Sequence, residues 1–247
     1  MNRIEKPEIT LPFLFVGVVS AACLLPAIRR FREAHVPFLS LQRGVAPLHL
    51  SYLGVLGAGG ALGLTHWKRI AYEGSLLYTD YSIAAQGNRW YDEIKGSNII
   101  LSAIPLNDRG HLEELKEKGV VAVLACVEDF ELLPGWQHTP VTAEQWREAG
   151  IEWKQIHAQD YLPMAQNQVN EAMTFLEEWT PKGKVVVHCK AGRGRSATVV
   201  TAYQMKKNKQ DRTTALKDVQ KYRTQVNLNA LQKTALTKFE KSLSTEG

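Results

Sequence analysis

The chain after residue 89 alternates short apolar runs with charged segments of helical spacing. Runs typical of buried strands occupy residues 98–104, 120–127, 153–158 and 185–187. Apolar positions at helical spacing predict helices over residues 112–116, 169–179, 196–206, 213–222 and 228–243. Thr142 and Gln145 have the spacing of a capping box, which predicts one more helix that ends near Gly150. We therefore expect an α/β domain with a central sheet flanked by helices.

The first third of the chain contains two long apolar stretches. Residues 11–28 form a run of eighteen positions without a charged side chain, and residues 45–65 form a run of twenty-one. As helices they would span about 27 to 32 Å, which is enough to cross a bilayer. Small residues four positions apart, such as Gly59 and Gly63, let membrane helices approach closely. A Gly-rich buried core segment or a cleaved leader is the alternative interpretation.

These patterns divide the chain into three parts. We expect an N-terminal hydrophobic helical hairpin that anchors residues 1–70 in a membrane, a linker over residues 71–88, and the α/β domain over residues 89–247. Basic residues do not set the orientation of the hairpin, because four lie on its flanks and four in its connecting loop. The chain is thus predicted to be a membrane protein with two spanning helices.

The cysteines indicate a reducing compartment. Three cysteines in 247 residues, Cys23, Cys126 and Cys189, are too few and too widely separated for a disulfide framework. Cys126 ends a predicted strand, so we expect it in the core, although a reversible disulfide with Cys189 is an alternative. A reactive thiolate suits the cytoplasm, and we place the α/β domain there.

The net charge of +5 favours an anionic partner. A basic cluster follows the helix predicted over residues 196–206, and it consists of Lys206, Lys207, Lys209 and Arg212. Each cation near an anionic bilayer adds roughly 1 kcal/mol of attraction. No motif that interleaves aromatic and basic residues is present, so nucleic acid is not an expected partner.

The segment with the clearest chemistry is the loop from His188 to Ser196, which joins a predicted strand to a predicted helix. Unpaired backbone N–H groups at a helix N-terminus can turn toward one anion, and Gly192 and Gly194 let the backbone curl tightly. Cys189 lies six residues before Arg195, whose planar guanidinium matches phosphate oxygens.

Such a loop would lower the pKa of the Cys189 thiol, which is ordinarily near 8.5, and leave the thiolate as the dominant form. The hydroxyl of Ser196 can stabilise that thiolate. The expected phosphate-binding residues are Lys190, Ala191, Gly192, Arg193, Gly194, Arg195 and Ser196. The Gly-x-x-x-x-Gly-Lys pattern of a nucleotide-binding loop is missing, and a buried structural cysteine is the plainer alternative.

With this loop, the chain resembles the cysteine-dependent phosphatases, and within them the mitochondrial-type phosphatidylglycerophosphate phosphatases of the dual-specificity group. The resemblance covers roughly residues 89–243, and it rests on Arg89-Trp90-Tyr91-Asp92, Ala103-Ile104-Pro105-Leu106, the acidic segment from Glu128 to Glu131, and the loop. In the acidic segment the family favours Glu-Glu-Tyr-Glu, so Asp129 and Phe130 are conservative departures. The resemblance implies a cysteine-dependent phosphatase fold and a phosphocysteine intermediate.

The resemblance also implies a general acid about thirty residues before the cysteine. Asp160 lies 29 residues before Cys189, after a predicted strand, and is our candidate. Its plainer interpretation is a turn residue ahead of Pro163. Glu128, Asp129 and Glu131 are the alternative acids or supporting residues, and they could equally form a solvated acidic loop.

Neither a metal nor a cofactor is expected. The seven histidines are scattered, and His188 is expected to orient the loop or to tune the thiolate. Lys190 and Arg193 would suit a multiply charged phospholipid head group, or they could form an exposed basic rim. We therefore expect a phospholipid substrate, and the family resemblance together with the apolar hairpin implies phosphatidylglycerophosphate. The alternatives are a phosphoinositide, a phosphoprotein cleaved at tyrosine, serine or threonine, and a module that only binds phosphorylated partners.

Overall fold

The computed structural model describes residues 60–245. Most of the predicted hydrophobic hairpin, including the whole of the stretch 11–28, lies outside these residues. By its internal contacts the chain divides into two units, residues 1–74 and residues 75–247. The second unit contains the whole sheet and the Cys189 loop.

A mixed sheet of five strands forms the centre of this unit. The strands are β1 (Tyr91–Ile94), β2 (Ile99–Ser102), β3 (Val120–Cys126), β4 (Glu152–Ile156) and β5 (Lys184–His188). Their order in the sheet is β1-β2-β5-β3-β4, with β1 antiparallel to β2 and the other neighbours parallel. Since β5 pairs on one side with β2 and on the other with β3, its end is held by two neighbours, and Cys189 follows directly after it.

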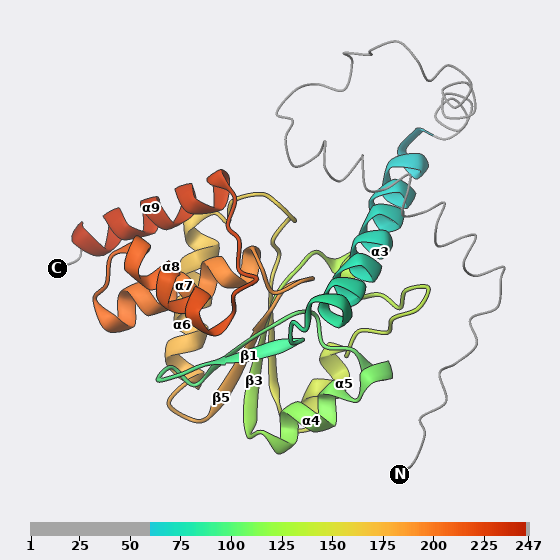
Figure 1. Ribbon diagram of the computed structural model, residues 1–247, viewed down its shortest axis with the longest axis horizontal. Helices are drawn as coiled ribbons and strands as arrows, with labels where there is room; N and C mark the ends of the chain where they lie inside the picture. Colours follow the sequence, from blue (N-terminus) through green and yellow to red (C-terminus); the bar gives the residue numbers. More distant parts are fainter. Residues whose placement is uncertain (1–59, 246–247) are drawn as a thin grey trace. The chain divides into compact units, whose positions relative to one another are not determined.

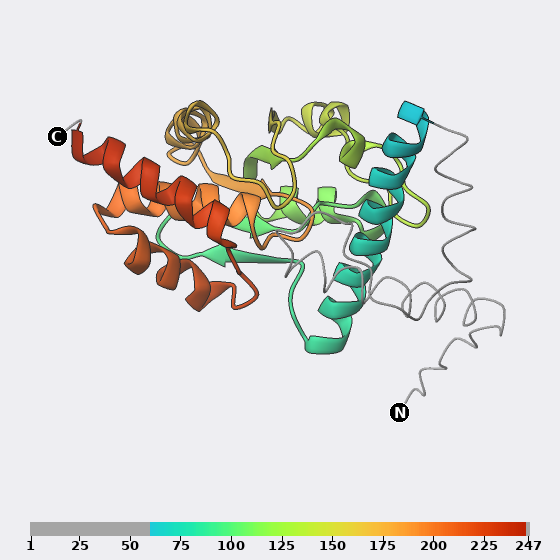
Figure 2. The ribbon, with the colours of Figure 1, turned by 90° about the horizontal axis from the view of Figure 1, so that it is seen from above.

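Helices cover the two faces of the sheet. Figures 1 and 2 show the C-terminal helices grouped along the strands, and they are α6 (Gln166–Trp179), α7 (Arg195–Asn208), α8 (Arg212–Tyr222) and α9 (Ala230–Thr245). The opposite face carries α4 (His111–Glu117) and α5 (Ala143–Glu148). This layering buries a continuous apolar strand such as β5 on both sides, as parallel sheets require.

The alternation of side chains along the strands explains the two cores. Val185 and Val187 of β5 belong to the larger cluster, in which they pack with side chains of α6 and α7. Val186, between them, points the other way and packs with Leu115 of α4 and Trp146 of α5. All three valines are fully buried.

Most of the predicted elements are present within a few residues of their expected ends. The capping box is confirmed, since the Thr142 side chain accepts a hydrogen bond from Gln145 N and the Gln145 side chain accepts one from Thr142 N. The sequence pattern does not predict β1. This strand has four residues with the sequence Tyr-Asp-Glu-Ile, which is too short and too polar to show a strand period.

Helix α3 (Gly60–Gln86) precedes the sheet. It includes residues 71–86, so the segment predicted as a linker is helical over most of its length. Within the second unit, Asp80 of α3 forms an ion pair of 2.6 Å with Arg109. Among residues 60–245, no helix combines the length and the apolar character needed to cross a bilayer.

Candidate active site

Cys189 begins the loop that connects β5 to α7. Its thiol is 3% exposed, and the Ser196 hydroxyl, in the first turn of α7, donates a hydrogen bond of 3.2 Å to its sulfur. The strand before it and the helix after it thus bring the expected nucleophile and the expected supporting hydroxyl together, as the sequence predicts.

The carbonyl groups of the loop point away from its inner side. Each of the five carbonyls from residue 190 to residue 194 accepts a hydrogen bond from a group outside the loop. The donor–acceptor distances are 2.8 to 3.2 Å. The backbone N–H groups of Ile104, Asn227 and Thr198 donate to the carbonyls of Lys190, Arg193 and Gly194, respectively, and the Arg223 side chain donates to the carbonyls of Ala191 and Gly192. A trans peptide group directs its C=O and the following N–H in opposite directions. The N–H groups of residues 191–195 therefore face the inner side, where an anion would be bound.

Gly192 is required for this curl. Its φ of +65° lies in the left-handed region that favours glycine. A Cβ at this position would also lie 2.6 Å from the backbone carbonyl of Ser102, which belongs to β2. The loop can therefore pack against the end of β2 only with a glycine here.

Arg195 is held in one orientation by Glu131. The guanidinium is 1% exposed and forms a bidentate pair with this carboxylate, at 2.5 Å from Nη1 and 2.9 Å from Nη2. Nη1 also donates to the carbonyl of Ala158 at 2.9 Å. Its Nε is buried and makes no hydrogen bond in the described part of the chain, although Asp160 Oδ1 lies 3.4 Å away as an ion-pair partner. A buried donor of this kind is rare, and a phosphate oxygen would satisfy it.

The carboxylates of the acidic segment 128–131 differ in burial and in their contacts. Glu131, in the short 3₁₀ helix Asp129–Leu132, is almost fully buried, so its interpretation as part of a solvated loop is wrong. Asp129 is exposed and pairs with His157 at 3.2 Å, while Glu128 is half-buried. A cavity of about 380 Å³ is lined by Glu128, Asp129, Phe130, His157 and Gln159.

Asp160 lies between two cations of the site. Lys190 Nζ is 2.5 Å from its Oδ2, and Arg195 Nε is 3.4 Å from its Oδ1. Burial would raise the pKa of this carboxyl, but the charges of Lys190 and Arg195 outweigh it and hold the pKa below its usual value. Lys190 is itself buried, so it does not belong to an exposed basic rim.

The segment after Asp160 is tied to the C-terminal helices. Tyr161 has a φ of +63°, which is uncommon for a residue other than glycine. The Asn229 side chain donates a hydrogen bond of 2.8 Å to the Tyr161 carbonyl, just before α9 begins. This contact fixes the backbone of the segment next to the expected acid.

The surroundings of Cys189 favour its thiolate. Burial alone would raise its pKa, but the charge of Arg195 and the side-chain and backbone hydrogen bonds from Ser196 outweigh it and lower the pKa below the ordinary value. Burial lowers the pKa of His188 to about 4, so its ring is neutral at neutral pH and adds no positive charge to the thiolate. Burial, and to a lesser degree the neighbouring Cys189, raises the pKa of Cys126, a free thiol in the core.

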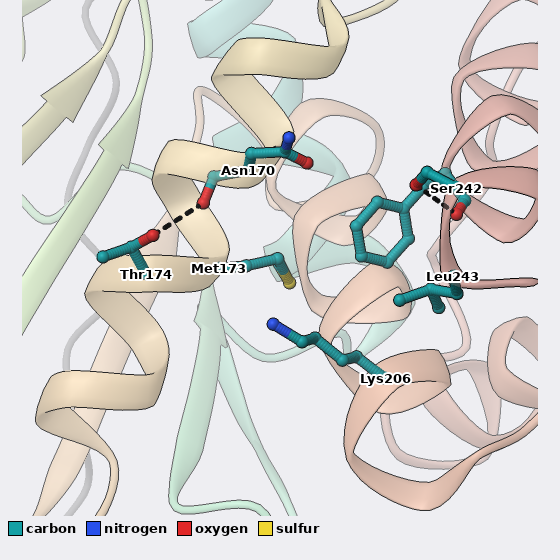
Figure 3. Close-up of a pocket in the computed structure, with 7 residues that line it drawn as sticks. Asn170, Met173, Thr174, Lys206, Ser242 and Leu243 are labelled. Carbon is teal, nitrogen blue, oxygen red and sulfur yellow. Dashed lines mark hydrogen bonds between the residues drawn. The ribbon is translucent and has the colours of Figure 1, made fainter. Parts of the chain in front are cut away.

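Two further features lie apart from Cys189. Two of the four members of the predicted basic cluster form local ion pairs, Lys206 with Glu177 at 2.6 Å and Arg212 with Glu240 at 3.4 Å. A cavity of about 120 Å³ lies between α6, α7 and α9 (Figure 3). It is lined by Asn170, Met173, Thr174, Lys206, Phe239, Ser242 and Leu243. None of the expected site residues is among them.

Comparisons with known proteins agree with this geometry. The profile of the family "Dual specificity phosphatase, catalytic domain" matches residues 107–242. The mouse protein "Phosphatidylglycerophosphatase and protein-tyrosine phosphatase 1" is 28% identical over 182 residues, which are 71% of this chain and 91% of that protein. The Arabidopsis thaliana protein "Phosphatidylglycerophosphate phosphatase PTPMT2" is 30% identical over 190 residues, 76% of this chain and 75% of that protein.

Solved structures give the same result for the fold. The crystal structure of PTPMT1 in complex with PI(5)P superposes with a TM-score of 0.57 at 26% identity, and covers 64% of this chain and 99% of that one. The crystal structure of Tk-PTP in the active form gives a TM-score of 0.54 at 27% identity, with 62% and 97% covered.

We predict that Glu131→Gln lowers kcat/KM for an aryl phosphate by about 100-fold, because the amide places an N–H group against the Arg195 guanidinium and removes the charge that orients it. Steady-state hydrolysis of para-nitrophenyl phosphate measures this. Glu178→Gln, which removes an exposed carboxylate paired with Lys182, is the control and should stay within about twofold of the wild type. An unchanged kcat/KM in Glu131→Gln would show that Arg195 does not need this partner.

Proposed function

Because the chain belongs to the dual specificity phosphatase family and is a cysteine-dependent phosphoric monoester hydrolase, we propose that it converts phosphatidylglycerophosphate to phosphatidylglycerol. The chemistry rests on one observation, the buried Cys189 sulfur at the start of a loop in which the carbonyls of residues 190–194 are all bound from outside. The choice of substrate is supported by two relatives that are named as phosphatidylglycerophosphate phosphatases and match at least 71% of the chain.

In the first step, the Cys189 thiolate attacks phosphorus and forms a phosphocysteine. The bond between phosphorus and the glycerol oxygen breaks, and Asp160, in its protonated form, gives its proton to the departing alkoxide. The inward N–H groups of residues 191–195 and the Nε of Arg195 bind the phosphate oxygens as charge develops on them. These roles make the Arg195 side chain and the backbone of residues 191–195 the proposed phosphate site.

In the second step, a water molecule attacks the phosphocysteine. The Asp160 carboxylate accepts a proton from this water, the P–S bond breaks, and inorganic phosphate leaves. The sulfur departs as a thiolate, which the Ser196 hydroxyl stabilises from 3.2 Å. Once phosphate has left, Lys190 and Arg195 again lower the pKa of Asp160, which loses this proton to the solvent, and the enzyme returns to its starting form.

Substrate binding raises the pKa of Asp160, as its role as a general acid requires. Lys190 and Arg195 hold the pKa of this carboxyl low in the unliganded site. A bound phosphate dianion adds two negative charges next to the carboxyl and competes for the same two cations. The pKa of Asp160 therefore rises when substrate is bound, and the protonated form becomes available for the first step.

We also propose a membrane location, with the domain that contains Cys189 on the cytoplasmic side. The apolar stretches 11–28 and 45–65 support it, since a lipid substrate must reach a site held close to the bilayer. The whole of the first stretch and residues 45–59 of the second lie outside the described residues, so the sequence pattern carries this part of the proposal.

A phosphoinositide is the second candidate substrate. The observation that favours it is the solved complex of PTPMT1 with PI(5)P, whose chain is almost entirely covered by this fold. Both lipids present a phosphomonoester on a polyhydroxy alcohol, which the same loop could bind.

A phosphate-release panel tests the proposed substrate. The full chain is assayed against phosphatidylglycerophosphate, PI(5)P and a phosphotyrosine peptide, with each lipid in mixed micelles and Cys189→Ser as the blank. We expect kcat/KM for phosphatidylglycerophosphate to exceed that for the other two by at least about tenfold. Preference for the inositide would select the second candidate, and preference for the peptide would reject both lipids.

We predict that Asp160→Asn slows release of an alkyl phosphate by about 100-fold or more, but slows para-nitrophenyl phosphate by less than about tenfold. The reason is that an alkoxide needs a proton on departure, whereas nitrophenolate is a stable anion. Comparing kcat for glycerol 3-phosphate and para-nitrophenyl phosphate measures the difference. Equal slowing of the two substrates would indicate that another group supplies the proton.

A further inference from the structure

Arg223 lies behind the Cys189 loop, although neither the sequence pattern nor the family loop includes it. It follows directly after α8 and is 1% exposed. Its guanidinium donates to five acceptors, at 2.7 to 3.3 Å, and they are the carbonyls of Gly192, Ala191, Trp90 and Arg89 and the Oδ2 of Asp92. A guanidinium has five N–H groups, so this set uses its full donor capacity.

Two of these contacts act on the loop itself. Nε donates to the Gly192 carbonyl at 2.8 Å, and Nη2 donates to the Ala191 carbonyl at 3.2 Å. These two carbonyls belong to the peptide groups whose N–H groups come from Arg193 and Gly192, on the opposite, inner side. Arg223 itself cannot bind the phosphate in this arrangement, because it occupies the outer side of the same peptide groups.

The charge of Arg223 is balanced by Asp92 of β1. Nη1 donates to Oδ2 of this carboxylate at 2.7 Å, and only 8% of the Asp92 side chain is exposed. A buried cation without such a partner would be costly, so the pair lets a guanidinium stay behind the loop. The short strand β1 thereby gains a function, since it brings Asp92 to this position.

We propose that Arg223 is a positioning residue for phosphate hydrolysis, which holds the Ala191 and Gly192 carbonyls outward so that the N–H groups of Gly192 and Arg193 remain directed at the phosphate. Asp92 keeps Arg223 in place. The proposal depends on cysteine-dependent hydrolysis and not on the choice of lipid substrate. A lysine at position 223 would carry the charge, but its single ammonium group could not reach the two loop carbonyls, the Asp92 carboxylate and the backbone carbonyls just before β1 at once.

The test must separate Arg223 from the other charged groups that act on Cys189. Cys126 of β3, His188 of β5, Asp160 and Arg195 act on Cys189 directly, while Glu131 and Lys190 act on it through their pairs with Arg195 and Asp160. None of these is altered in the variants below. A change in the pH dependence can therefore be assigned to the loop conformation or to the charge at position 223.

The experiment compares Arg223→Lys with the wild type, using para-nitrophenyl phosphate. We expect kcat/KM to fall by at least about tenfold and the inhibition constant of inorganic phosphate to rise by about tenfold. The acidic limb of the pH profile of kcat/KM should move to higher pH, because fewer inward N–H groups stabilise the thiolate. Arg89→Gln is the matched control. Its exposed side chain also pairs with Asp92, at 2.8 Å, but is not a donor to the loop, so all three quantities should stay within about twofold.

A lower melting temperature with an unchanged pH profile and unchanged phosphate inhibition would mean that Arg223 only stabilises the fold, and would overturn the proposal. If Arg223→Lys does not fold, the double variant Asp92→Leu with Arg223→Met decides. Replacing a buried ion pair by apolar side chains commonly preserves folding, while this replacement removes both donors to the loop. A shifted acidic limb and weaker phosphate inhibition in the double variant support the proposal, and wild-type values overturn it.

Discussion

The orientation of the peptide groups between residues 190 and 194 is the constraint on which the rest of the site depends. A sulfur anion buried to 3% exposure would be unstable unless dipoles and one cation faced it. The loop meets this requirement because groups outside it donate hydrogen bonds to its carbonyls. These donors lie after β2, at the C-terminal end of α8, in the segment that follows α8, and in the first turn of α7. The central place of β5 in the sheet explains why so many elements can reach this loop.

The site also contains an internal charge balance. Arg195 is neutralised by Glu131, and Lys190 by Asp160, so each buried cation has a carboxylate partner before substrate arrives. The two pairs differ in what they allow. The bidentate pair with Glu131 leaves the Nε of Arg195 for a phosphate oxygen, while the pair with Lys190 keeps Asp160 ionised until a dianion competes for the cation. One pair thus fixes geometry, and the other couples the proton of the expected acid to substrate binding.

Local features were predictable from the sequence, and long-range partners were not. The Cys189 loop, the capping box at Thr142 and the strand before Cys189 each depend on residues close together in the chain, and the structure has them where the pattern indicates. The sequence did not distinguish Glu131 from the other two carboxylates of the acidic segment, because no local signal indicates that a residue 64 positions before Arg195 pairs with it. Arg223 and Asp92 are 131 positions apart, and their meeting depends on the packing of α8 against a strand that was itself too short to predict. The neutral His188 likewise reflects burial, which the sequence pattern does not report.

The most direct test of this account is the pH dependence of alkylation of Cys189 in the unmodified protein. Iodoacetamide labelling at this residue, followed by mass spectrometry of its peptide, gives the midpoint of thiolate formation without relying on any substrate. The account predicts a midpoint well below the value near 8.5 of an ordinary thiol, because Arg195, Ser196 and the inward N–H groups stabilise the anion. A midpoint at or above that ordinary value would contradict it, since the loop would then fail to hold the sulfur as a thiolate.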